Sequence, residues 1–96
     1  MPRYLSLVTV GDRQFQNVQE LASLWGEIRG ELEAFDVEIK DTYAILGAYD
    51  FLIIFEAPDR DTVFQAAITI EGYGLDLETM EITDTDRFAE LVEDNP

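Results

Sequence analysis

The stretch ILGAYDFLIIFE, residues 45–56, decides the fold of this chain. A turn centred on glycine leads into five consecutive large apolar residues at positions 51–55. A strand with one buried face alternates apolar and polar side chains, so a run that is apolar at every position predicts a strand buried on both faces. Helices of the same chain can cover one face. We expect a second sheet, contributed by another subunit, to cover the other.

The residues before this stretch predict a strand at 3–10, a long helix within 12–35 and a half-buried strand at 37–45. The long helix has one apolar stripe, with residues spaced three and four apart. This stripe consists of Val18, Leu21, Trp25, Ile28, Leu32 and Phe35.

The residues after the stretch predict a second helix, capped by Asp59 and ending at Gly72 or Gly74. Its apolar side is expected to contain Val63, Phe64, Ala67 and Ile70. A strand at 77–83 follows, and then a short helix capped by Asp84 or Thr85. That last helix has a small apolar edge made by Phe88, Leu91 and Val92.

This order, βαββαβ plus a terminal helix, predicts a ferredoxin-like α+β sandwich with a four-stranded antiparallel sheet. The sequence contains no linker, so residues 1–96 are expected to form a single domain. In this topology helices cover one sheet face and leave the other open. Because the third strand is apolar on both faces, we predict a homodimer or higher oligomer that buries the open face.

Composition excludes several classes of function. The chain has no cysteine and no histidine, which excludes disulfides, thiolate and imidazole metal sites, Cys-His and Ser-His-Asp catalysis, and His-ligated haem. We accordingly expect neither a metal nor a cofactor. There is no apolar run of membrane-spanning length and no signal peptide pattern, which predicts a cytoplasmic protein.

The charge balance is strongly acidic. The 21 acidic and 6 basic residues give a net charge of −15. Such a surface repels nucleic acid and anionic membranes, so neither is expected as a partner. A hydrophobic content of 47% argues against disorder. A folded, carboxylate-covered domain whose only lysine is Lys40 is typical of a halophile, because high salt screens the repulsion.

The motif Gly47-Ala48-Tyr49-Asp50, directly before the apolar strand, resembles the GYD domain family, named for Gly-x-Tyr-Asp. The resemblance extends over nearly the whole chain, from the opening Pro-Arg-Tyr strand to the final Thr-Met-Glu-Ile strand. It implies a dimeric α/β barrel, in which two ferredoxin-like subunits pack sheet on sheet. It implies no settled biochemical activity.

Three groups of residues are candidates for a ligand pocket. Tyr49 and Asp50 could act as proton donor and base, or could simply form the turn that Gly47 begins. Lys40 could bind an anionic ligand, or could be an edge-strand charge that discourages aggregation. Tyr4, Ser6, Thr79 and Glu81 would line a polar pocket on the open sheet face if Leu5, Leu7, Met80 and Ile82 faced the helices.

Three functional classes remain open. We favour a non-catalytic oligomeric module that assembles or binds a small molecule, because no catalytic set converges in the sequence. The alternative is a cofactor-independent enzyme, resembling a small oxygenase or isomerase, that uses Tyr, Asp and Glu side chains in a barrel pocket. A protein-interaction partner that uses the acidic surface is the third class.

Overall fold

The computed structural model describes residues 1–10 and 18–95. The long helix was expected within 12–35, and residues 12–17 of that range lie outside the described residues. The elements follow the expected order. They are β1 (Arg3–Val10), α1 (Val18–Glu33), β2 (Glu38–Ala44), β3 (Phe51–Glu56), α2 (Arg60–Glu71), β4 (Leu75–Ile82) and α3 (Thr85–Asp94).

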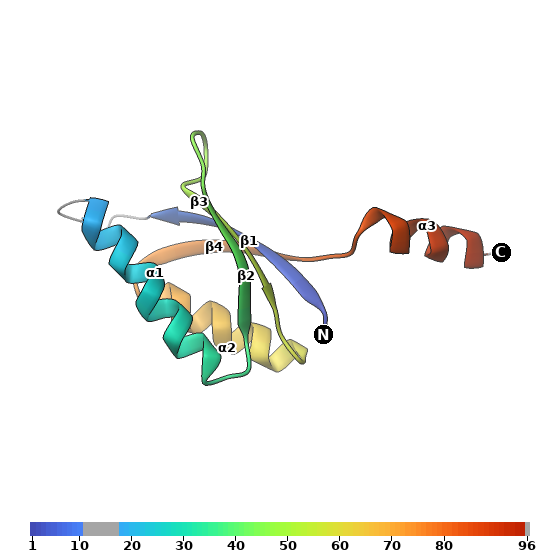
Figure 1. The fold of residues 1–96 in the computed structure, drawn as a ribbon, viewed down its shortest axis with the longest axis horizontal. Helices are drawn as coiled ribbons and strands as arrows, with labels where there is room; N and C mark the ends of the chain where they lie inside the picture. Colours follow the sequence, from blue (N-terminus) through green and yellow to red (C-terminus); the bar gives the residue numbers. More distant parts are fainter. Residues whose placement is uncertain (11–17, 96) are drawn as a thin grey trace.

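The strands form an antiparallel four-stranded sheet in the order β2-β3-β1-β4. Both α1 and α2 lie against the same face of this sheet (Figure 1). The apolar strands β1 and β3 occupy the centre, and the more polar strands β2 and β4 form the edges. The predicted ferredoxin-like α+β fold is therefore confirmed.

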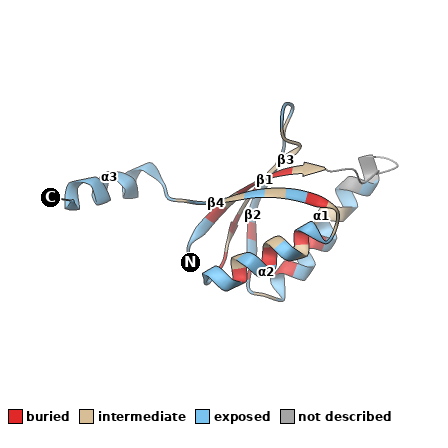
Figure 2. Ribbon diagram, turned by 180° about the vertical axis from the view of Figure 1, so that it is seen from behind, coloured by how far each residue is buried: buried red, intermediate tan, exposed pale blue. Residues whose placement is uncertain are grey.

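The core lies between the sheet and the two helices (Figure 2). Ile28 and Leu32 of α1 are fully buried, as the predicted stripe requires. On α2 the buried residues are Thr62, Ala66 and Ile70. Phe64, which was predicted to face inward on α2, is instead 58% exposed. The sheet contributes Tyr4, Val8, Ile39, Ile53, Phe55 and Leu75 to the core.

Leu5 and Leu7 do not face the helices, which was the condition for a polar pocket on the open face. Tyr4, Ser6 and Val8 are buried under the helices, whereas Leu5 and Leu7 are only half-buried on the opposite face. The strand can turn this way because the buried Ser6 hydroxyl finds a hydrogen-bond partner within the sheet.

The connections use the expected capping residues. Asp59 precedes α2, and its carboxylate accepts the backbone N–H of Thr62 at 2.9 Å. Asp84 precedes α3 and accepts the backbone N–H of Arg87 at 2.7 Å. After α2 the chain turns through Gly74, whose φ of 87° lies in the left-handed region that favours glycine.

The last helix, α3, projects away from the sheet and from the other two helices (Figures 1 and 2). Every residue of α3 is exposed. The molecule consequently measures 55 × 31 × 18 Å. No helix within residues 1–10 and 18–95 has both the length and the apolar character needed to cross a membrane.

Candidate functional site

Four predicted pocket residues lie together on one sheet face. In the pairing of β1 with β4, Tyr4 lies opposite Glu81 and Ser6 lies opposite Thr79. The hydroxyl oxygens of Ser6 and Thr79 are 2.7 Å apart and share a hydrogen bond. The condition for a polar pocket on the open face is therefore not met, because these four residues lie on the helix-covered side.

A hollow of about 220 Å³ opens where α2 meets β4. Its lining is mostly apolar and consists of Tyr4, Val63, Phe64, Ala67, Thr79 and Glu81. Burial, and after it the negative charges of Glu81 and Asp59, raise the pKa of the Tyr4 phenol. A phenol can donate a hydrogen bond to a ligand, and a carboxylate such as that of Glu81 can accept one. Such a hollow suits a small ligand with an apolar body and one polar end.

Gly47 and Asp50 of the Gly-x-Tyr-Asp motif shape the β2–β3 turn. Gly47 has a φ of 158°, which side chains rarely adopt. The Asp50 carboxylate accepts the backbone N–H of Val10 at 2.8 Å, and the Asp50 N–H donates to the carbonyl oxygen of Val8 at 2.9 Å. Asp50 thus fastens the hairpin to the end of β1.

Tyr49 reaches a different part of the sheet. Its hydroxyl donates to the Glu78 carboxylate on β4 at 2.8 Å, and this hydrogen bond raises the pKa of Tyr49. The phenol of Tyr49 and the carboxylate of Asp50 therefore have separate partners. Neither residue lines the hollow beside Tyr4. This arrangement favours the structural interpretation of the motif over an acid–base pair.

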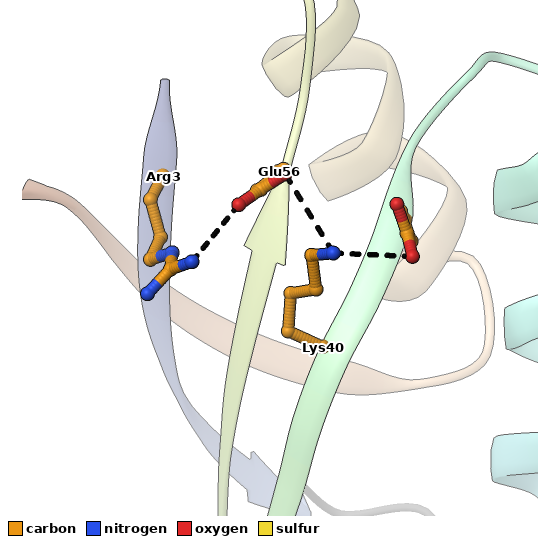
Figure 3. Close-up of polar contacts among 4 residues, drawn as sticks. Arg3, Lys40 and Glu56 are labelled. Carbon is orange, nitrogen blue, oxygen red and sulfur yellow. Dashed lines mark hydrogen bonds and ion pairs between the residues drawn. The ribbon is translucent and has the colours of Figure 1, made fainter. Parts of the chain in front are cut away.

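Lys40 belongs to a group of paired charges at one end of the sheet (Figure 3). Its Nζ lies 3.2 Å from a Glu38 carboxylate oxygen and 3.9 Å from a Glu56 carboxylate oxygen. Arg3 donates to the other Glu56 oxygen at 3.0 Å, and this hydrogen bond is the largest cause that lowers the pKa of Glu56. Lys40 thus lies apart from the hollow and is engaged by two carboxylates.

The open face is the sheet surface that α1 and α2 leave uncovered. Its apolar side chains come from the three adjacent strands β3, β1 and β4, where Leu5 pairs with both Ile54 and Met80. We define the open face by Leu5, Leu7, Leu52, Ile54, Met80 and Ile82. Met80 is 46% exposed, and the others are half-buried. The predicted apolar character of both faces of β3 is therefore present.

The acidic stretches 59–61 and 84–86 serve as helix caps. Asp59 and Asp84 each accept a backbone N–H from the first turn of the helix that follows. In residues 1–10 and 18–95, no group of three or more acidic side chains is arranged to hold a metal ion.

Two features of the surface escaped the sequence interpretation. Phe64 lines the hollow, and the Arg60 Cζ lies 5.8 Å from the centroid of its ring. Its position in the apolar pattern had instead suggested the core. The apolar edge of α3 was recognised from its spacing. The pattern gave no sign that the helix would lie away from the rest of the chain.

Two comparisons relate this chain to known proteins. Residues 4–92 match the sequence pattern of the GYD domain. A protein of Thermus thermophilus is 32% identical to this chain over 89 residues, which cover 88% of this chain and 94% of that protein. It is named glutamine synthetase and cystathionine beta-lyase binding protein.

Proposed function

This chain belongs to the GYD domain family, and from that membership we propose that it is a non-catalytic module that self-associates and binds partner enzymes. The observation that carries the proposal is the open face. Its apolar side chains lie on the surface of a chain whose net charge is −15. Contiguous apolar surface on such a protein is typical of an interaction site.

Self-association through the open face would give a homodimer. The ion pairs of Arg3 and Lys40 with Glu56 neutralise charge at one end of this face. A second copy can therefore approach the open face with less repulsion than it meets over the acidic remainder of the surface. Two sheets packed in this way would bury both sides of β3, as its sequence predicts.

The proposal of partner enzymes is supported by the Thermus relative, whose name describes binding to glutamine synthetase and cystathionine beta-lyase. The two chains align over most of both lengths. We infer that this chain binds one or both of the corresponding enzymes of its host. The acidic composition supports a cytoplasm with high salt as the setting.

Sedimentation velocity in molar KCl tests self-association, with two matched substitutions. Ile54→Asp places a charge on the open face, and the dimer should become a monomer. Ile68→Asp makes the same change at a residue of α2 that is 66% exposed, and the dimer should persist. A wild-type monomer, or equal effects of both substitutions, would overturn the proposed assembly.

Binding to enzymes is tested with the purified glutamine synthetase and cystathionine beta-lyase of the host. Biolayer interferometry in molar KCl should detect saturable binding of this chain to at least one enzyme. The Thermus relative with its own two enzymes is the positive control. If this chain binds neither enzyme while the control binds, the proposed enzyme binding is refuted. The proposed self-association is not affected by that result.

A second candidate function is supported by the hollow beside Tyr4. A phenol, a hydroxyl and a carboxylate line it, from Tyr4, Thr79 and Glu81, and the buried Ser6 hydroxyl shares a hydrogen bond with Thr79. We propose that this site would bind a small ligand or serve a cofactor-independent reaction. A thermal-shift screen of small amines and neutral aromatic compounds tests it. A compound that stabilises wild type but neither Tyr4→Phe nor Glu81→Gln would support the site. Equal stabilisation of all three proteins would refute it.

A further inference from the structure

The last helix exposes an apolar stripe that none of the other described elements covers. We call this helix, residues 85–94, the arm. Phe88, Leu91 and Val92 lie at the i, i+3 and i+4 positions of one helix side and are 58%, 41% and 54% exposed. Among the described elements, contacts join the sheet with α1 and α2, whereas the arm takes part in none.

An uncovered arm of this length needs a docking surface. The arm has ten residues, and isolated helices shorter than about 12–15 residues are marginal in water. Most helical stability in proteins comes from packing an amphipathic face against something else. The stripe is therefore the side by which the arm would be held.

The arm's own sheet is poorly placed to supply that surface. Only Thr83 and Asp84 connect β4 to the arm, and Asp84 is engaged in capping the helix. The arm continues outward from the end of β4 instead of turning back over the sheet (Figure 1). A second molecule can supply that surface.

The tip of the β2–β3 hairpin offers a complementary surface. We define the hairpin tip as residues 43–49, a segment without a charged side chain. Within it Leu46 is fully exposed and Tyr43 is 55% exposed. The polar side of the arm is acidic, with Asp86, Glu90 and Glu93, so an uncharged apolar surface is where the arm meets the least repulsion.

The arm and the hairpin tip leave opposite ends of the sheet. The arm follows Ile82, which pairs with Arg3 at the beginning of β1. The hairpin tip precedes Phe51, which pairs with Val8 near the end of β1. If two sheets pack face to face about a two-fold axis with antiparallel strands, the arm of each copy lies at the same end of the dimer as the hairpin tip of the other.

We propose that the arm of one copy docks, through Phe88, Leu91 and Val92, on the hairpin tip of a second copy, and that the exchange is reciprocal. This inference rests on the proposed self-association through the open face. It adds a second contact that closes the dimer. It also gives the exposed Leu46 and the uncovered apolar stripe of the arm a common role.

Directed cross-linking tests the docking, because the chain contains no cysteine of its own. Leu91→Cys and Leu46→Cys are made in separate copies of different mass, mixed under reducing conditions in molar KCl, and then oxidised. The mixed disulfide should form between the two copies. Asp86→Cys, on the acidic side of the arm, is the matched control and should give about tenfold less of it. Equal yields from the two arm positions would overturn the docking.

The strength of the dimer gives an independent measurement. Leu91→Ser should raise the dimer dissociation constant about tenfold, which corresponds to about 1.4 kcal/mol, whereas Asp86→Asn should leave it nearly unchanged. If the wild-type protein is a dimer, but the cysteine variants form no mixed disulfide and Leu91→Ser leaves the dissociation constant unchanged, the docking of the arm is refuted. The proposed dimer through the open face would still stand. A wild-type monomer would refute both. A disulfide that closes within a single chain carrying both cysteines would show that the arm folds back.

Discussion

Asp50 holds the hairpin against the first strand, since its carboxylate accepts the Val10 N–H and its own N–H donates to Val8. Asp50→Ala removes the acceptor and leaves the half-buried Val10 N–H without this partner. We expect the unfolding free energy to fall by about 1–2 kcal/mol. Urea unfolding at constant KCl, followed by circular dichroism, measures the change.

Tyr49→Phe is the matched substitution within the same motif. It removes only the hydroxyl that bonds to Glu78 in an exposed position. The unfolding free energy should change by less than about 0.5 kcal/mol. If Tyr49→Phe cost more than Asp50→Ala, our assignment of structural roles within the motif would be wrong.

Gly74 permits the turn between α2 and β4. Its φ of 87° places the residue where a Cβ is strained, and Gly74→Ala should destabilise the fold by about 1–2 kcal/mol. Gly30→Ala is the control, because a Cβ at that α1 position meets no atom within 4 Å. Alanine should stabilise the helix there by about 0.8–1 kcal/mol. In thermal unfolding, Gly74→Ala should lower the melting temperature and Gly30→Ala should raise it. A change in the same direction for both substitutions would contradict this account.

At the scale of elements, Tyr73 ties the end of α2 to α1. Its hydroxyl donates to the Glu31 carboxylate at 2.7 Å, and this hydrogen bond, more than any other cause, raises the pKa of Tyr73 from 10.0 to about 12. Because the folded-state pKa is the higher one, the protonated phenol stabilises the fold below pH 10, and this contribution is lost as the pH rises toward 12.

Tyr73→Phe should therefore weaken the dependence of stability on pH in that interval. Unfolding in urea at several pH values between 9 and about 12 measures the slope. Glu31→Gln, which removes the charged acceptor of this hydrogen bond, should weaken the slope in the same way. An unchanged slope in Tyr73→Phe would mean that the hydrogen bond to Glu31 does not persist in solution.

The positions of the helices and strands along the chain can be predicted from the sequence. Which face of a strand turns toward the helices cannot. The range 3–10 for β1 is confirmed, because Gly11-Asp12 ends a clear β pattern. The face that β1 turns toward the helices could not be predicted from local pattern, since both alternate sets contain apolar residues. The buried set depends on contacts with distant parts of the chain, such as the hydrogen bond between Ser6 and Thr79, which are 73 residues apart.

For the candidate site, too, the sequence predicts some features and leaves others open. Side-chain alternation suggested that Tyr4, Ser6, Thr79 and Glu81 could share the open face. The register of β1 with β4 places Tyr4 opposite Glu81 and Ser6 opposite Thr79, on the face that the helices cover. The hollow itself depends on how α2 packs over β4, which places Phe64 at its border instead of in the core. Helix periodicity does not specify that packing, because Phe64 and Thr62 are both compatible with an inward position.

At the scale of the whole molecule, charge repulsion should make stability depend on salt. The net charge is −15, and the screening length falls from about 30 Å at 0.01 M salt to about 3 Å at 1 M. The melting temperature should therefore rise steeply with KCl. Sorbitol at matched osmolality is the control and should raise it far less. A melting temperature that does not change with KCl would contradict the halophilic interpretation.

The position of β1 at the centre of the sheet has a consequence for synthesis of the chain. Of the four described strands of the sheet, β1 is synthesised first and its neighbour β4 last. One edge of β1 therefore stays unpaired until β4 has been made, and contacts this distant in sequence slow folding. A circularly permuted chain in which β4 precedes β1 should refold faster in stopped-flow experiments, and an unchanged rate would show that β1–β4 pairing is not limiting. In the natural order, the nascent protein carries an open strand edge through most of its translation.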